Sequence, residues 1–294
     1  MTPRHRTLAV LVAAGAALLP TTARSQCIGL SENSPEAKLL AFYAVPLAFN
    51  ASSQPEQLLP WHFRFTLEVT PMPAADSARR ATTCYASSKQ ESTNLASVFP
   101  RPRVAVGLPF NFEAEVSWVP PLKVKDAQAN LIGLSLAWTR RVAIVAGASV
   151  IAQARVHTVI GSVEGPITCG IDALQANPLL PCYGRTPSND RYTPNLSGGE
   201  LNAAIDLGDY AIYVSGGVNS LAPEFQVNFP VGAGYPNPPA ADRSLVTLGK
   251  RLSRYTVGAG ATWRIFRGVD LSAQLYNSVN DVSITRIMLS YVAR

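Results

Sequence analysis

The sequence is poor in histidine, in charged residues and, after its first twenty residues, in long apolar runs. Histidine occurs three times in 294 residues, and charged residues make up 15%. Lys and Arg outnumber Asp and Glu by 25 to 19, but no basic stripe or known module accompanies the excess, so we expect no nucleic acid partner. No later run reaches the roughly 20 apolar residues of a membrane-spanning helix, which excludes a helical anchor in the mature chain.

The chain begins with the features of a secretory signal. A basic region around Arg4 precedes the apolar run Leu8–Leu19, and small residues follow up to Ser25. This order is typical of a cleavable signal peptide. We therefore expect residues 1–25 to be removed and the mature protein to be exported.

The four cysteines all lie in the expected mature chain. An oxidising compartment favours disulfides. Cys169 and Cys182 bracket one Pro-rich loop, which predicts a local bridge and leaves Cys27 to pair with Cys84. Metal binding is the alternative, but the sequence has neither CxxC pairs nor histidines close to these cysteines. We expect no metal and no cofactor.

A hairpin near the C-terminus shows a hydrophobic period of two. Its first arm, Tyr255–Ile265, places Val257 and Trp263 on one face and polar or small residues on the other. The second arm, Val269–Tyr276, repeats the alternation after a short link. Successive side chains of a strand point to opposite faces, so each arm is predicted to be a strand with one apolar face.

About ten segments of this kind recur along the chain, each roughly ten residues long, which is typical of a transmembrane β-barrel. Thr139–Arg141 is interpreted as a tight turn between the fourth and fifth. The segments, in order, are Trp61–Thr70, Arg103–Leu108, Phe110–Trp118, Ile132–Trp138, Val142–Val156, Glu200–Leu207, Tyr210–Ser220, the two arms of the hairpin, and Ser283–Ala293.

The links between these segments alternate in length. Links after the second, fourth, sixth and eighth segments are short, whereas most of the others are long. Outer-membrane barrels have short periplasmic turns and long external loops. A β-sandwich, the alternative, has no reason to alternate in this way. We therefore predict an all-β fold, a transmembrane antiparallel up-and-down β-barrel of about 10 strands, within a range of roughly 8 to 14.

An apolar segment precedes the barrel. Ser34 has the properties of a helix cap, with Pro35 and Glu36 in the first turn. The following run, Ala37–Val45, is apolar on all sides, so it must pack inside the protein or lie at the membrane. A plug or interfacial helix and an additional strand ended by Pro46 both fit. The predicted organisation is residues 26–57 as an N-terminal periplasmic or plug segment and 58–294 as the barrel.

With this pattern the chain resembles bacterial outer-membrane β-barrel proteins, in particular the porin-like and hydrophobic-solute transporter group that includes the long-chain fatty-acid transporter. The resemblance is one of pattern and covers Trp61–Ala293, while Ala37–Val45 looks like the N-terminal hatch of that group. It implies an outer-membrane location, with membrane lipid, the outer-membrane assembly machinery and small solutes as partners. The last strand departs from the usual assembly signal, which ends in an aromatic residue, because Tyr291 is followed by Val292, Ala293 and Arg294.

The inward face of the predicted strands carries charges of both signs. In a narrow lumen these charges are expected to pair, because isolated charges are costly there. One interpretation is a charged structural plug, and the other is a constriction whose arginines select anions or acidic head groups. The lumen-facing candidates are Arg64, Glu68, Glu113, Glu115, Arg155, Arg264 and Arg286.

Three functions follow from a barrel with such an interior. The first is a porin-like channel or transporter for small solutes, and the second is a closed structural or surface-interaction barrel. The third is a barrel enzyme acting on lipids or peptides, in which His157 would have to meet Asp172 or Asp190. No nucleophile pattern accompanies these residues, so we expect no catalytic residue and favour the first function.

Overall fold

The structure is a computed structural model that describes residues 27–76, 97–124, 126–145, 148–177, 182–229 and 245–293. The predicted signal peptide, residues 1–25, and Cys84 lie outside the described residues. Within the described part, no helix has the length and apolar character needed to cross a membrane.

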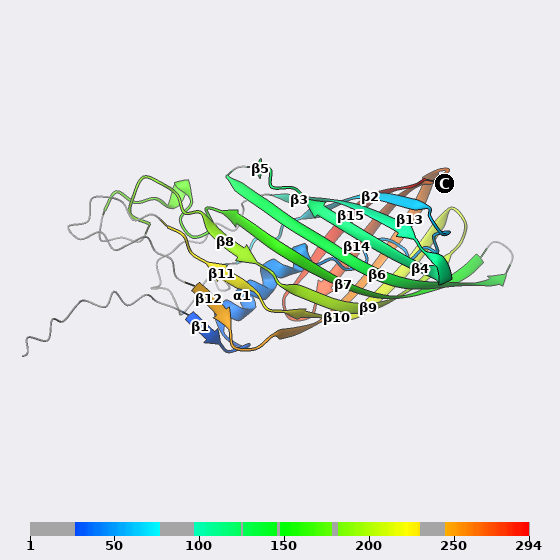
Figure 1. The fold of residues 1–294 in the computed structure, drawn as a ribbon, viewed down its shortest axis with the longest axis horizontal. Helices are drawn as coiled ribbons and strands as arrows, with labels where there is room; N and C mark the ends of the chain where they lie inside the picture. Colours follow the sequence, from blue (N-terminus) through cyan, green and yellow to red (C-terminus); the bar gives the residue numbers. More distant parts are fainter. Residues whose placement is uncertain are drawn as a thin grey trace, which may run out of the picture.

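Ten strands of the described residues form a closed antiparallel barrel. The ring closes because β15 pairs with β2, while β7 pairs with both β6 and β9. This architecture is the predicted one, that of the outer-membrane β-barrels (Figure 1). The barrel strands are β2 (Phe63–Pro71), β3 (Val98–Gly107), β4 (Phe112–Val119), β6 (Ala127–Val145), β7 (Ala148–Gly165), β9 (Leu196–Asp206), β10 (Tyr210–Leu221), β13 (Leu252–Phe266), β14 (Val269–Ser278) and β15 (Val282–Ala293).

The two ends of the barrel differ, as the link lengths predict. The turns β3–β4, β6–β7, β9–β10 and β13–β14 lie at one end, which we call the short-turn end. The opposite, long-loop end carries a small sheet that continues from β7 in the order β8, β11, β12 and β1 (Figure 1). Its strands are β8 (Asp190–Thr193), β11 (Glu224–Gln226), β12 (Leu245–Leu248) and β1 (Cys27–Leu30), and β5 (Lys123–Val124) pairs with the start of β6.

Two predicted boundaries are wrong. Thr139–Arg141 is not a turn but part of β6, which continues to Val145 and pairs with β7 throughout. Thr139, which is buried, and Arg141, which pairs with Asp206, continue the inward face of the strand, whereas Arg140 is exposed on the outward face. Strand β3 begins five residues before Arg103, because Val98–Pro102 pair with β2 in spite of two prolines.

The predicted alternation of faces is confirmed. Outward side chains such as Leu67, Val257 and Leu289 are about half exposed. An apolar outer face of this kind is typical of transmembrane barrels. The inward side chains of the same strands, such as Glu68, Thr256 and Met288, are buried. The barrel therefore has an apolar exterior and a polar, filled interior.

The N-terminal apolar segment is a helix, α1 (Pro35–Ala44), and not a strand. The Ser34 hydroxyl oxygen accepts a hydrogen bond from the Ala37 N–H at 3.1 Å, which is the predicted cap. A short 3-10 helix, η1 (Val45–Leu47), continues it, and both are buried within the barrel near its long-loop end (Figure 1). Two further 3-10 turns are η2 (Pro109–Asn111) and η3 (Ile171–Ala173).

The disulfide between Cys169 and Cys182 is formed, as predicted. Both sulfur-bearing residues are buried in the main apolar cluster at the long-loop end, together with Tyr192 and Phe225. Cys27 is also disulfide-bonded, while its predicted partner Cys84 lies outside the described residues. The disulfide therefore joins two points of the loop between β7 and β8 within this cluster.

Candidate functional site

The chain between η1 and β2 runs through the inside of the barrel. At the long-loop end, the Tyr192 hydroxyl donates to the Leu40 carbonyl of α1 at 2.7 Å. Burial raises the pKa of Tyr192 well above its ordinary value, so this donor stays protonated. At the short-turn end, the Gln57 amide donates to Asn111 Oδ1 at 2.6 Å. Residues 48–54 lie between these points and are called the filling segment below.

Phe49 is the centre of the filling segment. Its side chain is 0% exposed and lies against three guanidinium groups, with ring centroids 4.4 Å from Arg103, 5.1 Å from Arg155 and 5.7 Å from Arg101. Gly133 of β6 makes room for the ring, because a Cβ there would lie 2.8 Å from Phe49 Cγ. The ring is therefore enclosed by cations, an arrangement that stabilises both.

Arginines of the barrel wall hold the backbone of the filling segment. Arg101 donates to the Leu47 and Ala48 carbonyls at 2.7 and 2.8 Å. Arg103 and Arg155 donate to the carbonyls of Asn50 and Phe49, each at 3.1 Å, and Arg286 donates to that of Ala48 at 3.2 Å. These bonds satisfy carbonyl groups that would otherwise be buried without a donor. The segment thus stays in the lumen without forming regular structure.

Glutamates of the wall balance these arginines. Glu68 is 0% exposed and forms ion pairs with Arg103, with Arg101 at 3.9 Å and with Arg286 at 4.0 Å. Glu115 pairs with Arg155 at 2.7 Å and with Arg103 at 3.6 Å. Buried charges persist only when they are paired, and each charge of this cluster is. Among the described residues, however, several buried atoms of the cluster, including Arg103 Nε and Arg286 Nη1, have no hydrogen-bond partner.

A second polar network lies beside the first. The Glu200 carboxylate accepts from the Asn50 amide at 3.0 Å and from the Ala51 N–H at 2.5 Å. Asn219 donates to Asn50 Oδ1 at 3.0 Å and to the Tyr276 hydroxyl at 3.1 Å, and its own Oδ1 lies 3.0 Å from His157 Nε2. The network connects β7, β9, β10 and β14 to one residue of the filling segment.

The short-turn end is closed by further charges. Arg64 pairs with Glu113 at 2.6 Å and with Glu56, on the chain leaving the lumen, at 3.5 Å. Asp206 pairs with both Arg264 and Arg141. One cavity beside residues 51–54 measures about 10 Å³, which is no more than the space for one water molecule. The lumen is therefore filled in this conformation.

Six of the seven predicted lumen residues lie buried among these contacts, and Arg264 lies at the short-turn end, part-exposed. Three further buried charges, Arg101, Arg103 and Glu200, were not among the residues predicted from the sequence. Arg101 and Arg103 stand at a spacing of two with Phe99 and Ala105, which is the signal that marks them as inward. Their partners are backbone carbonyls distant in sequence, which no local pattern indicates.

His157 does not meet either aspartate considered for catalysis. Its Nε2 lies 3.0 Å from Asn219 Oδ1 in the lumen. Asp190 instead accepts bonds from Thr168, Ser188 and the Asn228 N–H at the long-loop end. Asp172 lies in η3, away from the lumen network. No group of three or more His, Cys, Asp or Glu side chains in the described part of the chain is arranged to hold a metal ion.

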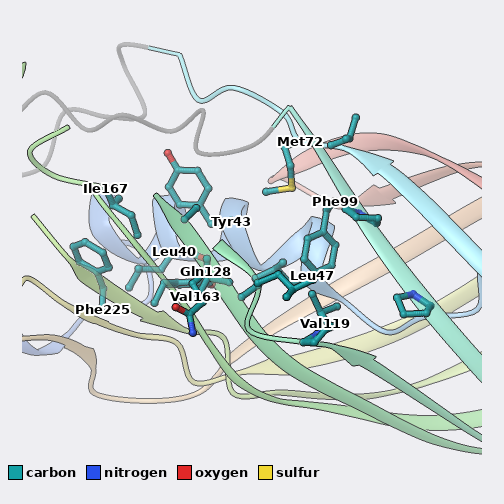
Figure 2. A pocket seen from close by; sticks show the side chains of 18 of the residues that line it. Leu40, Tyr43, Leu47, Met72, Phe99, Val119, Gln128, Val163, Ile167 and Phe225 are labelled. Atoms are coloured by element: carbon teal, nitrogen blue, oxygen red, sulfur yellow. The ribbon is translucent and has the colours of Figure 1, made fainter. Parts of the chain in front are cut away.

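An apolar pocket lies above the filled lumen, at the long-loop end. Its volume is about 410 Å³, and it is bounded by one side of α1 and by the barrel wall (Figure 2). Leu40 and Tyr43 come from the helix, and Phe99, Val119 and Val163 come from the wall. The polar side chain of Gln128 also lines the pocket. A concave, mostly apolar space with few polar groups is typical of a small-molecule site.

This pocket was not predicted from the sequence. Its lining comes from β3, β4, β6, β7, β8, β11 and α1, so only the folded barrel brings the residues together. The one available signal was the helix that is apolar on all sides, because such a helix needs apolar neighbours around its whole circumference.

No family model and no curated protein matches the sequence. Among solved structures, the chain is similar to the attachment invasion locus protein Ail of Yersinia pestis, with a TM-score of 0.30 and 8% identity over 80% of this chain and 100% of that one. It is similar to outer membrane phospholipase A from Escherichia coli, with a TM-score of 0.29 and 8% identity over 89% and 98%. It is also similar to the toluene transporter TbuX of Ralstonia pickettii, with a TM-score of 0.25 and 10% identity over 88% and 93%. TM-scores this low support no inference about function.

Proposed function

We propose that the protein is a bacterial outer-membrane transporter for small apolar solutes, closed in this conformation by its own N-terminal segment. The apolar exterior fits membrane lipid as the surrounding solvent, and insertion would use the outer-membrane assembly machinery. Solute binds in the apolar pocket, and passage requires the filling segment to move. The protein is exported, and no catalytic step is part of its role.

The observation that carries this proposal is the apolar pocket directly above a polar, filled lumen. A permanently open porin would have a water-filled path, whereas here arginines and glutamates occupy the path together with the filling segment. A purely structural barrel has no need of a cavity of about 410 Å³ lined by Leu39, Leu40 and Phe99. Empty apolar space costs stability, because its lining loses van der Waals contacts.

Binding of a small apolar probe tests the proposal. Purified protein in amphipol, without detergent micelles, is titrated with naphthalene, and saturation-transfer NMR reports binding. We expect saturable binding that is lost in Leu40→Trp, which fills the pocket, and kept in Leu275→Trp, whose side chain points outward from β14. Equal binding by both variants, or none by the unmodified protein, would contradict the pocket as the solute site.

The closed structural or surface-interaction barrel is the second candidate function. It is favoured by the filled lumen and by the Cys169–Cys182 disulfide, which closes part of a long loop. Planar-bilayer recordings in the presence of naphthalene separate the two. Discrete conductance steps that depend on the probe favour the transporter, and silence from correctly folded protein with no probe binding favours the structural barrel.

A further inference from the structure

The wall beside the apolar pocket is not continuously hydrogen-bonded. Strands β3 and β4 pair from Gly107 opposite Glu113 up to Arg103 opposite Ser117. Beyond that point, β3 continues for five residues, 98–102, that pair with β2 but with no residue of β4 in the described part of the chain. This unpaired edge corresponds to roughly 16 Å of strand. We call it the β3–β4 seam.

Prolines explain why the seam does not close. Continuing the β3–β4 register would place Pro102 opposite Trp118 and Pro100 opposite Pro120. Proline has no N–H, and in sheets it is confined to edges that face no partner strand. Since Pro100 and Pro102 pair with β2 on one side, the edge that lacks donors faces β4. The sequence itself therefore prevents the ladder from reaching the long-loop end at this position.

The pocket reaches both faces of the wall at the seam. Phe99 points inward, whereas Val98, Pro100 and Pro102 alternate with it and are exposed on the outer face. All four line the pocket. Pro102 pairs with Leu67, which is itself one of the half-exposed residues of the apolar exterior. The apolar surface that faces lipid is thus continuous with the apolar surface inside the pocket.

We propose that the β3–β4 seam is a lateral entrance through which the acyl chain of a membrane lipid enters the apolar pocket. The occupant is inferred from chemistry. The outer side of the seam lies among residues that contact hydrocarbon, and the inner side offers Leu39, Leu40 and Phe99 with few polar groups. A flexible chain of methylene groups matches both sides, and a polar solute matches neither. The inference deepens the proposed function and rests on it in one respect, that the pocket binds apolar molecules.

A photoreactive lipid tests the entrance directly. The full-length mature protein is reconstituted into phosphatidylcholine vesicles that contain a phospholipid with a diazirine near the end of one acyl chain. After irradiation and digestion, mass spectrometry locates the lipid adducts. We expect adducts on the peptide that contains Leu40 and Tyr43 of α1, in addition to those on outward residues of the strands. Adducts on outward residues alone would overturn the inference.

Matched variants identify the route. Trp118→Ala removes the exposed ring of β4 that the continued register would place opposite Pro102, and is expected to raise the yield of adducts on α1. The binding of naphthalene from water is expected to be kept, because Trp118 does not line the pocket. Leu67→Trp, on the neighbouring strand and outside the pocket, is expected to keep both. Equal α1 labelling in Trp118→Ala and the unmodified protein would show that lipid does not pass the seam and would overturn the proposal.

The outcomes also separate this inference from the proposed function. Naphthalene binding without lipid adducts on α1 removes the lateral entrance and leaves the solute pocket in place. Absence of both, in protein that migrates as a folded barrel, removes both. Loss of both signals in Leu40→Trp, with retention in Leu275→Trp, supports one shared pocket.

Discussion

The two halves of the lumen hold the N-terminal segment by different physical means. Towards the short-turn end, arginines and glutamates bind the backbone of the filling segment through directed hydrogen bonds. Towards the long-loop end, α1 packs through apolar contacts and leaves a cavity of about 410 Å³. Directed polar bonds specify one geometry, whereas apolar contacts tolerate rearrangement. The contrast indicates a fixed closure in the first half and an adaptable binding space in the second.

Removing the charge of Glu68 is expected to have the largest effect on this contrast. Glu68→Gln leaves Arg101, Arg103 and Arg286 without their shared counter-ion in a buried position. Breaking a buried ion pair costs about 3–5 kcal/mol. Urea unfolding in lipid vesicles measures it. The control, Glu164→Gln, breaks the exposed pair with Arg191 and is expected to cost about 1 kcal/mol or less. Equal losses of stability in the two variants would contradict the view that the half of the lumen towards the short-turn end depends on directed ion pairs.

Truncating Phe49 is the next largest change. Phe49→Ala removes the ring enclosed by Arg101, Arg103 and Arg155 and is expected to cost about 3 kcal/mol. It also creates space at the centre of the filling segment, so planar-bilayer recordings are expected to show discrete openings that the unmodified protein lacks. Phe110→Ala, at the exposed β3–β4 turn, serves as the control and should stay silent. Silence of both variants would argue that the closure does not depend on the ring.

Truncating Leu40 is expected to be milder. Leu40→Ala enlarges a pocket that already lacks some contacts, so the cost is expected near the lower end of the range for buried leucines, about 2 kcal/mol. Conductance should not change, because the filling segment keeps all its polar bonds. Urea unfolding and bilayer recording measure the two quantities. A loss of stability as large as that of Glu68→Gln would show that the packing towards the long-loop end is as tightly specified as that towards the short-turn end.

Removing the helix cap should give the smallest effect. Ser34→Ala loses the bond to the Ala37 N–H and is expected to destabilise the protein by about 1 kcal/mol. Ser34→Asp, which restores an acceptor, should recover the stability measured by urea unfolding. If Ser34→Ala changed naphthalene binding as strongly as Leu40→Trp, the helix end rather than its buried side would control the pocket.

The period of two in the sequence is enough to predict the barrel wall, because lipid and lumen impose opposite polarity on successive residues. It fails where another requirement competes. Pro100 and Pro102 argue against a strand, and the strand exists there because only β2 has to pair with it. Thr139–Arg141 looks like a turn because it is polar, but Thr139 and Arg141 face inward, where Arg141 reaches Asp206. Strands β8, β11 and β12 are too short for any periodicity to show.

For a related reason, only part of the candidate site can be predicted from the sequence. Alternation identifies the inward position of Glu68, Glu115 and Arg155, because it is a local property. It cannot identify what they contact, since Arg155 binds a carbonyl more than one hundred residues away. The apolar pocket is non-local in the same sense.

The path of the N-terminal segment also constrains how the protein can assemble. Strand β1 joins β12 at the long-loop end, and the chain then crosses the lumen and leaves at the other end to begin β2, the strand that pairs with β15. The last strand pairing to form therefore closes the barrel around a chain that is already inside the lumen. A barrel sealed first would have to admit that chain lengthwise past Arg101, Arg155 and Arg286. Wrapping, with the segment as its template, is the simpler order of events.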